Sequence, residues 1–172
     1  HLEAFLAVNH RNMHRLGTPA HGRAFFGAVL HHFPEARLLM LRLPRQGAWV
    51  GGMLLLPRGG TVHMPWVGSL AAHFDLRPNN LLYWEAIRSA AAAGYRSFDF
   101  GRSRADQGTF RFKEQHGGRP VQLHYQLHLV RAAHPPDLDP STPRFRLVTA
   151  AWRRLPFSLV RALGPRLIGR IP

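Results

Sequence analysis

The 172-residue sequence predicts a mixed α/β fold (α+β order), in which one central sheet carries helices on both faces. Three observations lead to this prediction. Apolar residues recur at helical spacing near the start, three β-type segments follow with hairpin-length turns between them, and a strand–helix–strand order fills the second half. The length suits one compact domain, and 45% hydrophobic residues are enough for a packed core.

Two helices are expected first. Residues 3–16 place apolar side chains at helical spacing, and the "GTP" that follows ends the run. Residues 22–33 predict a second helix, which Pro34 stops. Both helices precede the β-type segments, so they are expected to pack on the sheet.

Three strands are expected next, over residues 36–43, 48–56 and 61–69. The turns between them, "PRQG" and "PRGG", have the length and composition of hairpin connections. Pro65 lies inside the third segment and removes one backbone donor. It therefore predicts a bulge or an edge position there.

The second half is expected to alternate between helices and strands. The clearest helix begins at Asn79 or Asn80, continues to Ala93 and ends at Gly94. The remaining expected elements are a strand over 95–101, a short helix over 110–117 and an alternating strand over 120–130.

Three regions are expected: a lobe over residues 1–133, a linker over 134–143 and a tail over 144–172. The linker contains four prolines. The tail is basic and amphipathic, with seven arginines between apolar residues at helical spacing. Such a helix could lie on a membrane surface. Packing against the lobe is favoured, because Pro156, Gly164 and Pro165 interrupt a long helix.

The charge balance favours anionic partners. The formal net charge is +14, which suits nucleic acid, phosphorylated metabolites or an acidic membrane surface. The absence of cysteine excludes disulfides, a thiol nucleophile and a zinc–thiolate site. The sequence begins at His1 rather than at methionine, which suggests that an upstream portion is missing.

Histidine and serine give weaker signals. His10 and His14 stand four residues apart on the first expected helix, but no carboxylates cluster beside them, so a solvated helix face is expected and no metal site. Ser69 and Ser103 follow strands and could line a cleft. No nucleophile motif surrounds them, so capping of loop backbone is their ordinary role.

The densest group of polar residues lies between 98 and 118. Asp99 stands between two phenylalanines on a strand, so its side chain points away from theirs. Arg102 and Ser103 follow at the strand end, where open α/β sheets tend to hold ligands. Gly108 and Thr109 are expected to form the turn and cap of the next helix.

Lys113 is the one lysine in a chain with 22 arginines. An ammonium is a compact donor that can approach a single oxygen without the planar fork of a guanidinium. Together with Arg102, Arg104 and Arg111 it could surround an anion or a developing oxyanion. The ordinary alternative is a solvated surface lysine.

The sequence resembles the FemAB-like branch of the GNAT acyltransferase superfamily, in particular the FemAB-type proteins of exosortase (PEP-CTERM) and exopolysaccharide systems. The matching stretches span nearly the whole chain in family order. They are "RNMHRLGTP", "PWVGS", "RPNNLLYWEAI", "FDFGRS", "GTFRFKEQHG", "WRRLP" and "LGP". The chain departs from the family pattern at His116, where tryptophan is usual, and in the polar stretch 102–109.

The resemblance implies a GNAT-like fold and makes this chain the C-terminal of two such lobes. It implies a bacterial enzyme that transfers an acyl or aminoacyl group to an amine of a peptidoglycan or exopolysaccharide precursor. Lys113 and Arg102 are the catalytic candidates, and Asp99 is expected to organise the strand end rather than act as a base. The substrate-binding candidates are Trp66, Ser69, Asn79, Tyr83, Asp99, Ser103, Gly108, Thr109 and Phe112.

No permanently bound cofactor is expected, and the donor would be aminoacyl-tRNA or acyl-CoA. No glycine occurs between Leu70 and Ala93, and Pro78 lacks an amide, which disfavours a glycine-rich pyrophosphate turn. The expected partners are an amine-bearing envelope precursor, tRNA, an anionic membrane and the missing lobe. The cytoplasm, or the inner face of the membrane, is the expected location. A binding lobe for nucleic acid or an anionic polymer, without chemistry, stays open as the alternative.

Overall fold

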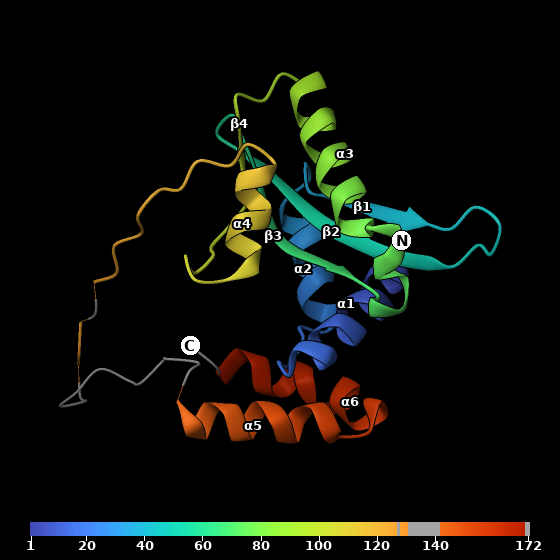
Figure 1. Ribbon diagram of the computed structural model, residues 1–172, viewed down its shortest axis with the longest axis vertical. Coiled ribbons are helices and arrows are strands. Elements are labelled where there is room, and N and C mark those ends of the chain that lie inside the picture. Colours follow the sequence, from blue (N-terminus) through green and yellow to red (C-terminus); the bar gives the residue numbers. More distant parts are fainter. Residues whose placement is uncertain (127, 131–141, 171–172) are drawn as a thin grey trace.

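The computed structural model of the chain describes residues 1–126, 128–130 and 142–170. In this part of the chain, four strands form one mixed sheet in the order β1-β2-β3-β4 (Figure 1). β1, β2 and β3 are antiparallel neighbours, and β4 pairs in parallel with β3. The strands are β1 (Arg37–Arg42), β2 (Trp49–Arg58), β3 (Thr61–Ser69) and β4 (Ser97–Asp99).

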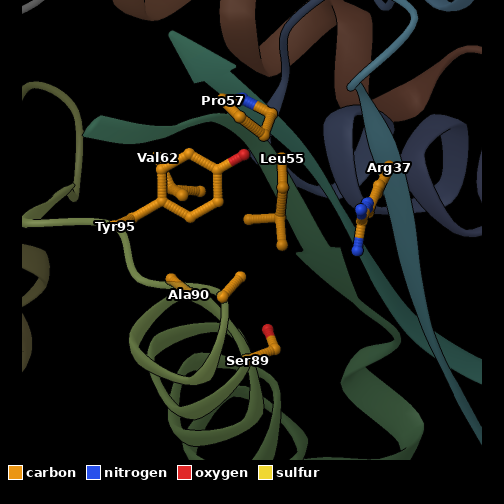
Figure 2. A pocket seen from close by; sticks show the side chains of 8 residues that line it. Arg37, Leu55, Pro57, Val62, Ser89, Ala90 and Tyr95 are labelled. Atoms are coloured by element: carbon orange, nitrogen blue, oxygen red, sulfur yellow. The ribbon is translucent and has the colours of Figure 1, made fainter. Parts of the chain in front are cut away.

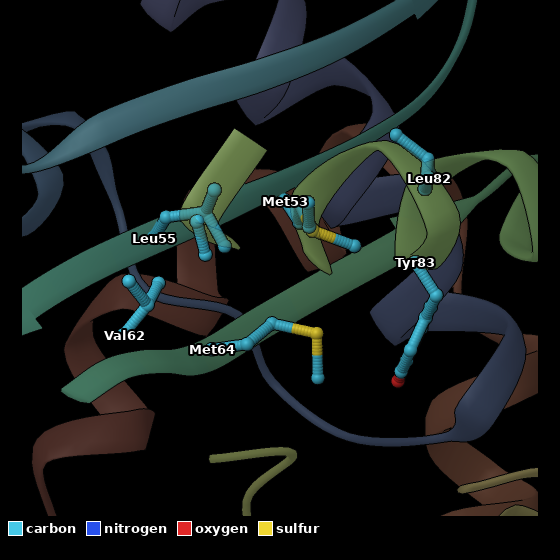
Figure 3. Packing of buried hydrophobic residues seen from close by; sticks show 8 residues of the cluster. Met53, Leu55, Val62, Met64, Leu82 and Tyr83 are labelled. Atoms are coloured by element: carbon cyan, nitrogen blue, oxygen red, sulfur yellow. The ribbon is translucent and has the colours of Figure 1, made fainter. Parts of the chain in front are cut away.

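Helices cover both faces of this sheet, as the sequence predicts. On one face α1 (Leu2–Leu16) and α2 (Arg23–His32) enclose a cluster around Phe5, Phe26 and Leu54, all fully buried. On the other face α3 (Pro78–Ala92) packs its Leu82 and Tyr83 against β2 and β3 (Figure 3). Alternate side chains of β2 feed the two clusters, which is why its burial is nearly continuous.

The bulge predicted at Pro65 is confirmed. Leu54 pairs with Trp66, and Leu56 pairs with His63, so two residues of β3 lie opposite one residue of β2. The extra residue changes which face the β3 side chains occupy. In an unbroken strand Met64 and Trp66 would share a face, but here Met64 lies in the cluster under α3 and Trp66 packs on the cluster under α1 and α2. The bulge therefore decides the face on which Trp66 lies.

The expected strand over residues 120–130 is wrong for its described part, 120–126 and 128–130, none of which belongs to a strand. Val121, Tyr125 and Val130 are strongly exposed. Alternation makes a strand only where a neighbouring strand supplies hydrogen-bond partners. The strand expected over 95–101 is shorter than predicted and consists of the three residues of β4. β4 is the edge strand of the sheet, so it leaves few backbone groups free to pair with a further strand.

The connection from β3 to α3 is the 3-10 helix η1 (Ala71–Leu76), which no sequence pattern predicted. α4 (Gly108–Gln115) begins two residues before the short helix expected there. It follows β4 after an irregular stretch and lies beside α3 (Figure 1).

The C-terminal segment forms α5 (Pro143–Arg154), α6 (Phe157–Leu167) and the 3-10 turn η2 (Ile168–Arg170). Trp152 and Val160 are buried, and the Arg153 guanidinium donates to the carbonyl of Leu16 at 3.1 Å. Packing of these helices on α1, which the interruptions in the sequence favoured, is thus confirmed. Of the expected linker over 134–143, residues 134–141 lie outside the described residues.

Among the described residues, no helix combines the length and the apolar character that crossing a bilayer requires.

Candidate active site

β3 and β4 separate where the candidate site lies. β4 pairs only with residues 61–63 of β3, and β3 then continues to Ser69 without β4 beside it. The chain leaves β4 through Gly101, whose φ of +68° favours glycine. A Cβ on Gly101 would lie 3.5 Å from the Met64 carbonyl oxygen, so this turn stays beside β3 at the point of separation.

Lys113 reaches this turn from α4. Its Nζ donates to the carbonyl oxygens of Gly101 and Arg102, each at 2.9 Å. Burial lowers the pKa of the Lys113 ammonium below its ordinary value, and the charge of Asp99 partly offsets this shift. An ammonium has three N–H donors, so one remains for a substrate oxygen.

The other residues predicted on this loop are placed less tightly. Arg102 is exposed, and its Nη1 donates to the Tyr125 hydroxyl at 3.2 Å. Ser103, Gly108 and Thr109 are also exposed. Gly108 begins α4, but Thr109 is not its cap: the N-cap is Gln107, which makes no side-chain capping bond. The capping role expected for Thr109 is therefore wrong.

An aromatic cluster supports the loop from the α3 side of the sheet. The Tyr83 ring stacks on Phe100 at 5.8 Å and meets Phe112 edge-on at 4.9 Å. His116 packs on Phe112 at 4.4 Å and hydrogen-bonds the Phe112 carbonyl. Burial raises the pKa of Tyr83 to about 12, so its phenol stays neutral. Tyr83 and Phe112 thus pack beneath the site rather than present polar groups to it.

His63 is a site residue that the sequence analysis missed. Its Nδ1 lies 3.0 Å from Oδ2 of Asp99, its Cα partner across the β3–β4 pair. Asp99 also accepts the Gly101 N–H at 2.7 Å. The side chain of Asp99 points away from Phe98 and Phe100, as alternation predicts. Alternation within "TVHMP" would have placed His63 on the same face, had the parallel register been known.

Two further candidates lie at the far end of β3. Ser69 is 2% exposed and its Oγ donates to Oδ1 of Asn79 at 2.8 Å, which ties β3 to the start of α3. Trp66 faces α2, where its ring meets Phe25 and Phe26 edge-on, both at 5.3 Å. Trp66 therefore packs against α2, on the face of the sheet opposite the Tyr83 cluster.

Two pockets are found elsewhere along β3, and His63, Asp99 and Lys113 line neither of them. A pocket of about 350 Å³ opens at the end of β3, lined by Arg11, Asn12, His14, Arg15, Ser69, Leu70, Ala71, Ala72 and Phe157. A much smaller one, about 40 Å³, lies beneath the last turns of α3, where Leu55, Ala90 and Tyr95 give it an apolar wall (Figure 2). It has room for about one water molecule, and few polar groups line it.

The histidine pair considered for a metal is divided between two roles. His10 is buried and its Nε2 lies 3.0 Å from the His21 carbonyl oxygen, whereas His14 lines the larger pocket. Among the described residues, no three histidine or carboxylate side chains come together as metal ligands would.

Residues 1–114 match the acetyltransferase (GNAT) domain family, and this match includes 114 of 172 residues. The chain belongs to the GNAT acetyltransferase family. Every residue of the candidate site up to Lys113 lies within the matched range, whereas α5 and α6 lie outside it. No curated protein matches the chain significantly.

Solved structures show the same GNAT fold. A protein described as a probable acetyltransferase is 14% identical, with a TM-score of 0.53 over 64% of this chain and 78% of that one. A tetramutant of BH1408 from Bacillus halodurans is 14% identical, with a TM-score of 0.51 over 62% and 73%. At such identity the likeness concerns the fold alone.

GNAT acetyltransferases typically use acetyl-CoA. A backbone cradle for its phosphates would use free amides at the start of a helix, and α3 is the helix that follows β3. The connection here is η1, without glycine, and Pro78 stands in the first turn of α3. The amide of Asn80 is already bonded to the Arg77 carbonyl. These residues do not fit a glycine-rich backbone cradle, so side chains would have to hold the phosphates.

Proposed function

We propose that this GNAT-family chain transfers an acyl or aminoacyl group to a primary amine at the point where β3 separates from β4. The observation that carries the proposal is the convergence of the His63–Asp99 pair and the Lys113 ammonium around the Gly101 turn. A general base can take the proton of the attacking amine, and a cationic hydrogen-bond donor can stabilise the oxyanion; acyl transfer to an amine uses both.

His63 would act as the base. When its Nδ1–H donates to the Asp99 carboxylate, Nε2 presents a lone pair. The amine nitrogen attacks the donor carbonyl carbon, and a C–N bond forms. The bond from that carbon to the donor's sulfur or oxygen then breaks. The amine proton passes to Nε2 and from there to the leaving group.

Lys113 would stabilise the negative charge that develops on the carbonyl oxygen of the donor. Two of its N–H groups hold the Gly101 and Arg102 carbonyls and fix the ammonium, and the third can donate to the oxyanion. Partial burial strengthens such a bond because less water screens it. Arg102 is exposed beside it, where it can contact a charged part of the substrate.

Within the GNAT family, we propose that the chain belongs to the FemAB-like branch and that its acceptor is an amine-bearing cell-envelope or exopolysaccharide precursor. The motifs "FDFGRS" and "GTFRFKEQHG" support it, and they build the turn and helix that carry Lys113. The lack of a glycine cradle and the net charge of +14 favour aminoacyl-tRNA over acyl-CoA as donor.

The test offers the purified chain two labelled donors, acetyl-CoA and aminoacyl-tRNA, with an amino sugar or a lysine-containing peptide as acceptor. Mass spectrometry should find an amide product with at least one donor, and His63→Gln should abolish it. Should wild-type protein bind donor or acceptor and yet form no amide with either, the chain is a binding lobe and the proposal fails.

A further inference from the structure

The C-terminal helices α5 and α6 carry a second inference, which does not depend on the transfer reaction. We propose that the outer side of these two helices binds the surface of an anionic phospholipid bilayer. They lie at one end of the molecule, next to α1 (Figure 1). α5 has 12 residues and α6 has 11, whereas a helix needs about 20 to cross a bilayer, so they would lie on its surface.

Packing on α1 uses only one side of α5. On that side Trp152 is buried, and the Arg153 guanidinium donates to the Leu16 carbonyl. Helical periodicity places Leu147 on the opposite side of α5. Leu147 is 71% exposed, and the neighbouring Val148 is 63% exposed. The contact with α1 therefore leaves two large aliphatic side chains in solvent.

α6 shows the same division. Val160 and Gly164 are buried, and a Cβ on Gly164 would lie 3.2 Å from the Ala20 amide nitrogen, so this side of α6 packs tightly on the body of the protein. Leu159 and Leu163 stand one turn apart on α6 and are 48% and 39% exposed. Each helix is thus held in place by one side and presents aliphatic side chains on another.

The charges on these helices have one sign. Residues 142–172 contain no aspartate or glutamate. Among the described residues, no carboxylate forms an ion pair with the exposed arginines of α5 and α6. Anionic lipid head groups would supply the missing negative charge, and basic side chains near such a surface strengthen binding. The exposed arginines are Arg146, Arg153, Arg154, Arg161 and Arg166.

The aliphatic side chains favour a bilayer over a nucleic acid, which would also match the positive charge. Surfaces that bind single-stranded nucleic acid place aromatic rings where the bases stack. The most exposed apolar side chains here are leucine and valine, which offer no stacking surface. A bilayer buries such side chains at the boundary between head groups and acyl chains, with the arginines beside the phosphates.

Vesicle flotation tests the aliphatic contribution. Wild-type protein should bind vesicles of equal parts phosphatidylglycerol and phosphatidylcholine, and bind phosphatidylcholine alone far more weakly. Leu147→Ser/Val148→Ser should weaken binding to the mixed vesicles at least about tenfold. The matched control is Leu81→Ser/Val121→Ser, which makes the same changes at exposed positions outside the two helices and should stay within about twofold of wild type. Equal losses in the two double variants, or no binding by wild-type protein, would overturn the proposal.

A second pair of variants tests the charge. Arg146→Gln/Arg154→Gln should weaken binding to the mixed vesicles more than Arg45→Gln/Arg58→Gln, which removes the same charge from exposed positions elsewhere. Equal losses would assign the effect to net charge and contradict a specific surface. Labelled tRNA is the competing probe. If tRNA binding alone depends on Arg146 and Arg154, the surface binds nucleic acid and the proposal is wrong.

The absence of cysteine allows a direct measurement of insertion. Ala151→Cys lies one turn after Leu147 on α5, and Ala91→Cys lies on α3; both positions are exposed. An environment-sensitive fluorophore should become brighter and shift to the blue with mixed vesicles only at position 151. Equal changes at both positions would contradict insertion of α5. His63→Gln should abolish transfer and leave vesicle binding intact, which separates failure of this surface from failure of the proposed reaction.

Discussion

His63 on β3 and Asp99 on β4 are Cα partners across a parallel strand pair, and a 3.0 Å contact joins their side chains. They are the last paired residues before the two strands separate. Asp99 uses its other oxygen to hold the amide of Gly101, the first step of the turn that Lys113 then binds. One carboxylate therefore links the imidazole to the loop that carries the ammonium.

Loss of the imidazole base should slow transfer without unfolding the protein. His63→Gln should lower kcat roughly 10²–10⁴-fold, the usual contribution of general base catalysis, with a smaller effect on KM. Asp99→Asn keeps an acceptor for Gly101 but removes the charge, so a smaller fall is expected. His32→Gln, at an exposed position on α2, is the control. Unchanged kcat in His63→Gln would exclude His63 as the base.

The charge of Lys113 should appear in the pH profile. Because burial lowers its pKa, activity should fall as the pH rises through a value below the ordinary 10.5. Lys113→Arg keeps its charge at every accessible pH, so whatever activity it retains should lack this alkaline limb. Lys113→Met should lose most of kcat. The measurement is kcat/KM from pH 7 to 10, and an alkaline limb that persists in Lys113→Arg would assign it to another group.

Trp66 should matter for stability and not for transfer. Its ring packs on Phe25 and Phe26, on the face of the sheet opposite the aromatic cluster of Tyr83. Trp66→Ala should lower the free energy of unfolding by roughly 2 kcal/mol, less than a fully buried tryptophan would. Urea denaturation measures this, and kcat/KM below the unfolding transition should stay within about twofold. A selective rise in KM would instead restore Trp66 as a substrate-binding residue.

Gly68 should be needed for the close approach of α1 to β3. Gly68→Ala places a Cβ 2.9 Å from Asn12 Nδ2, so α1 or Asn12 must move, at a cost of about 1–3 kcal/mol.

Gly27→Ala is the matched control for this substitution. Gly27 lies inside α2 with open space around the added methyl, so the change should stabilise the protein by up to about 1 kcal/mol. Denaturant titrations of both variants give the comparison. Equal stability in Gly68→Ala and wild type would contradict the packing described for Asn12.

The sequence alone determined the elements whose signals are local. Apolar spacing and end signals located α1, α2 and α3, and the turns "PRQG" and "PRGG" located the antiparallel strands. Pro65 marked the bulge, because a missing backbone donor disturbs the ladder wherever the strand pairs. The position of Asp99 between two phenylalanines predicted its direction, because side chains alternate along a strand.

Tertiary structure alone decided which distant residues meet. His63 and Asp99 stand 36 positions apart and become partners only through the parallel register of β3 and β4, which no local pattern encodes. The bulge in β3 places Trp66 on the opposite face of the sheet. Residues 120–126 form no strand, because an alternating sequence cannot by itself supply a neighbouring strand to hydrogen-bond with. Arg11 and Phe157 likewise meet only because α6 folds back onto α1, since helix-to-helix packing depends on the shape of both surfaces.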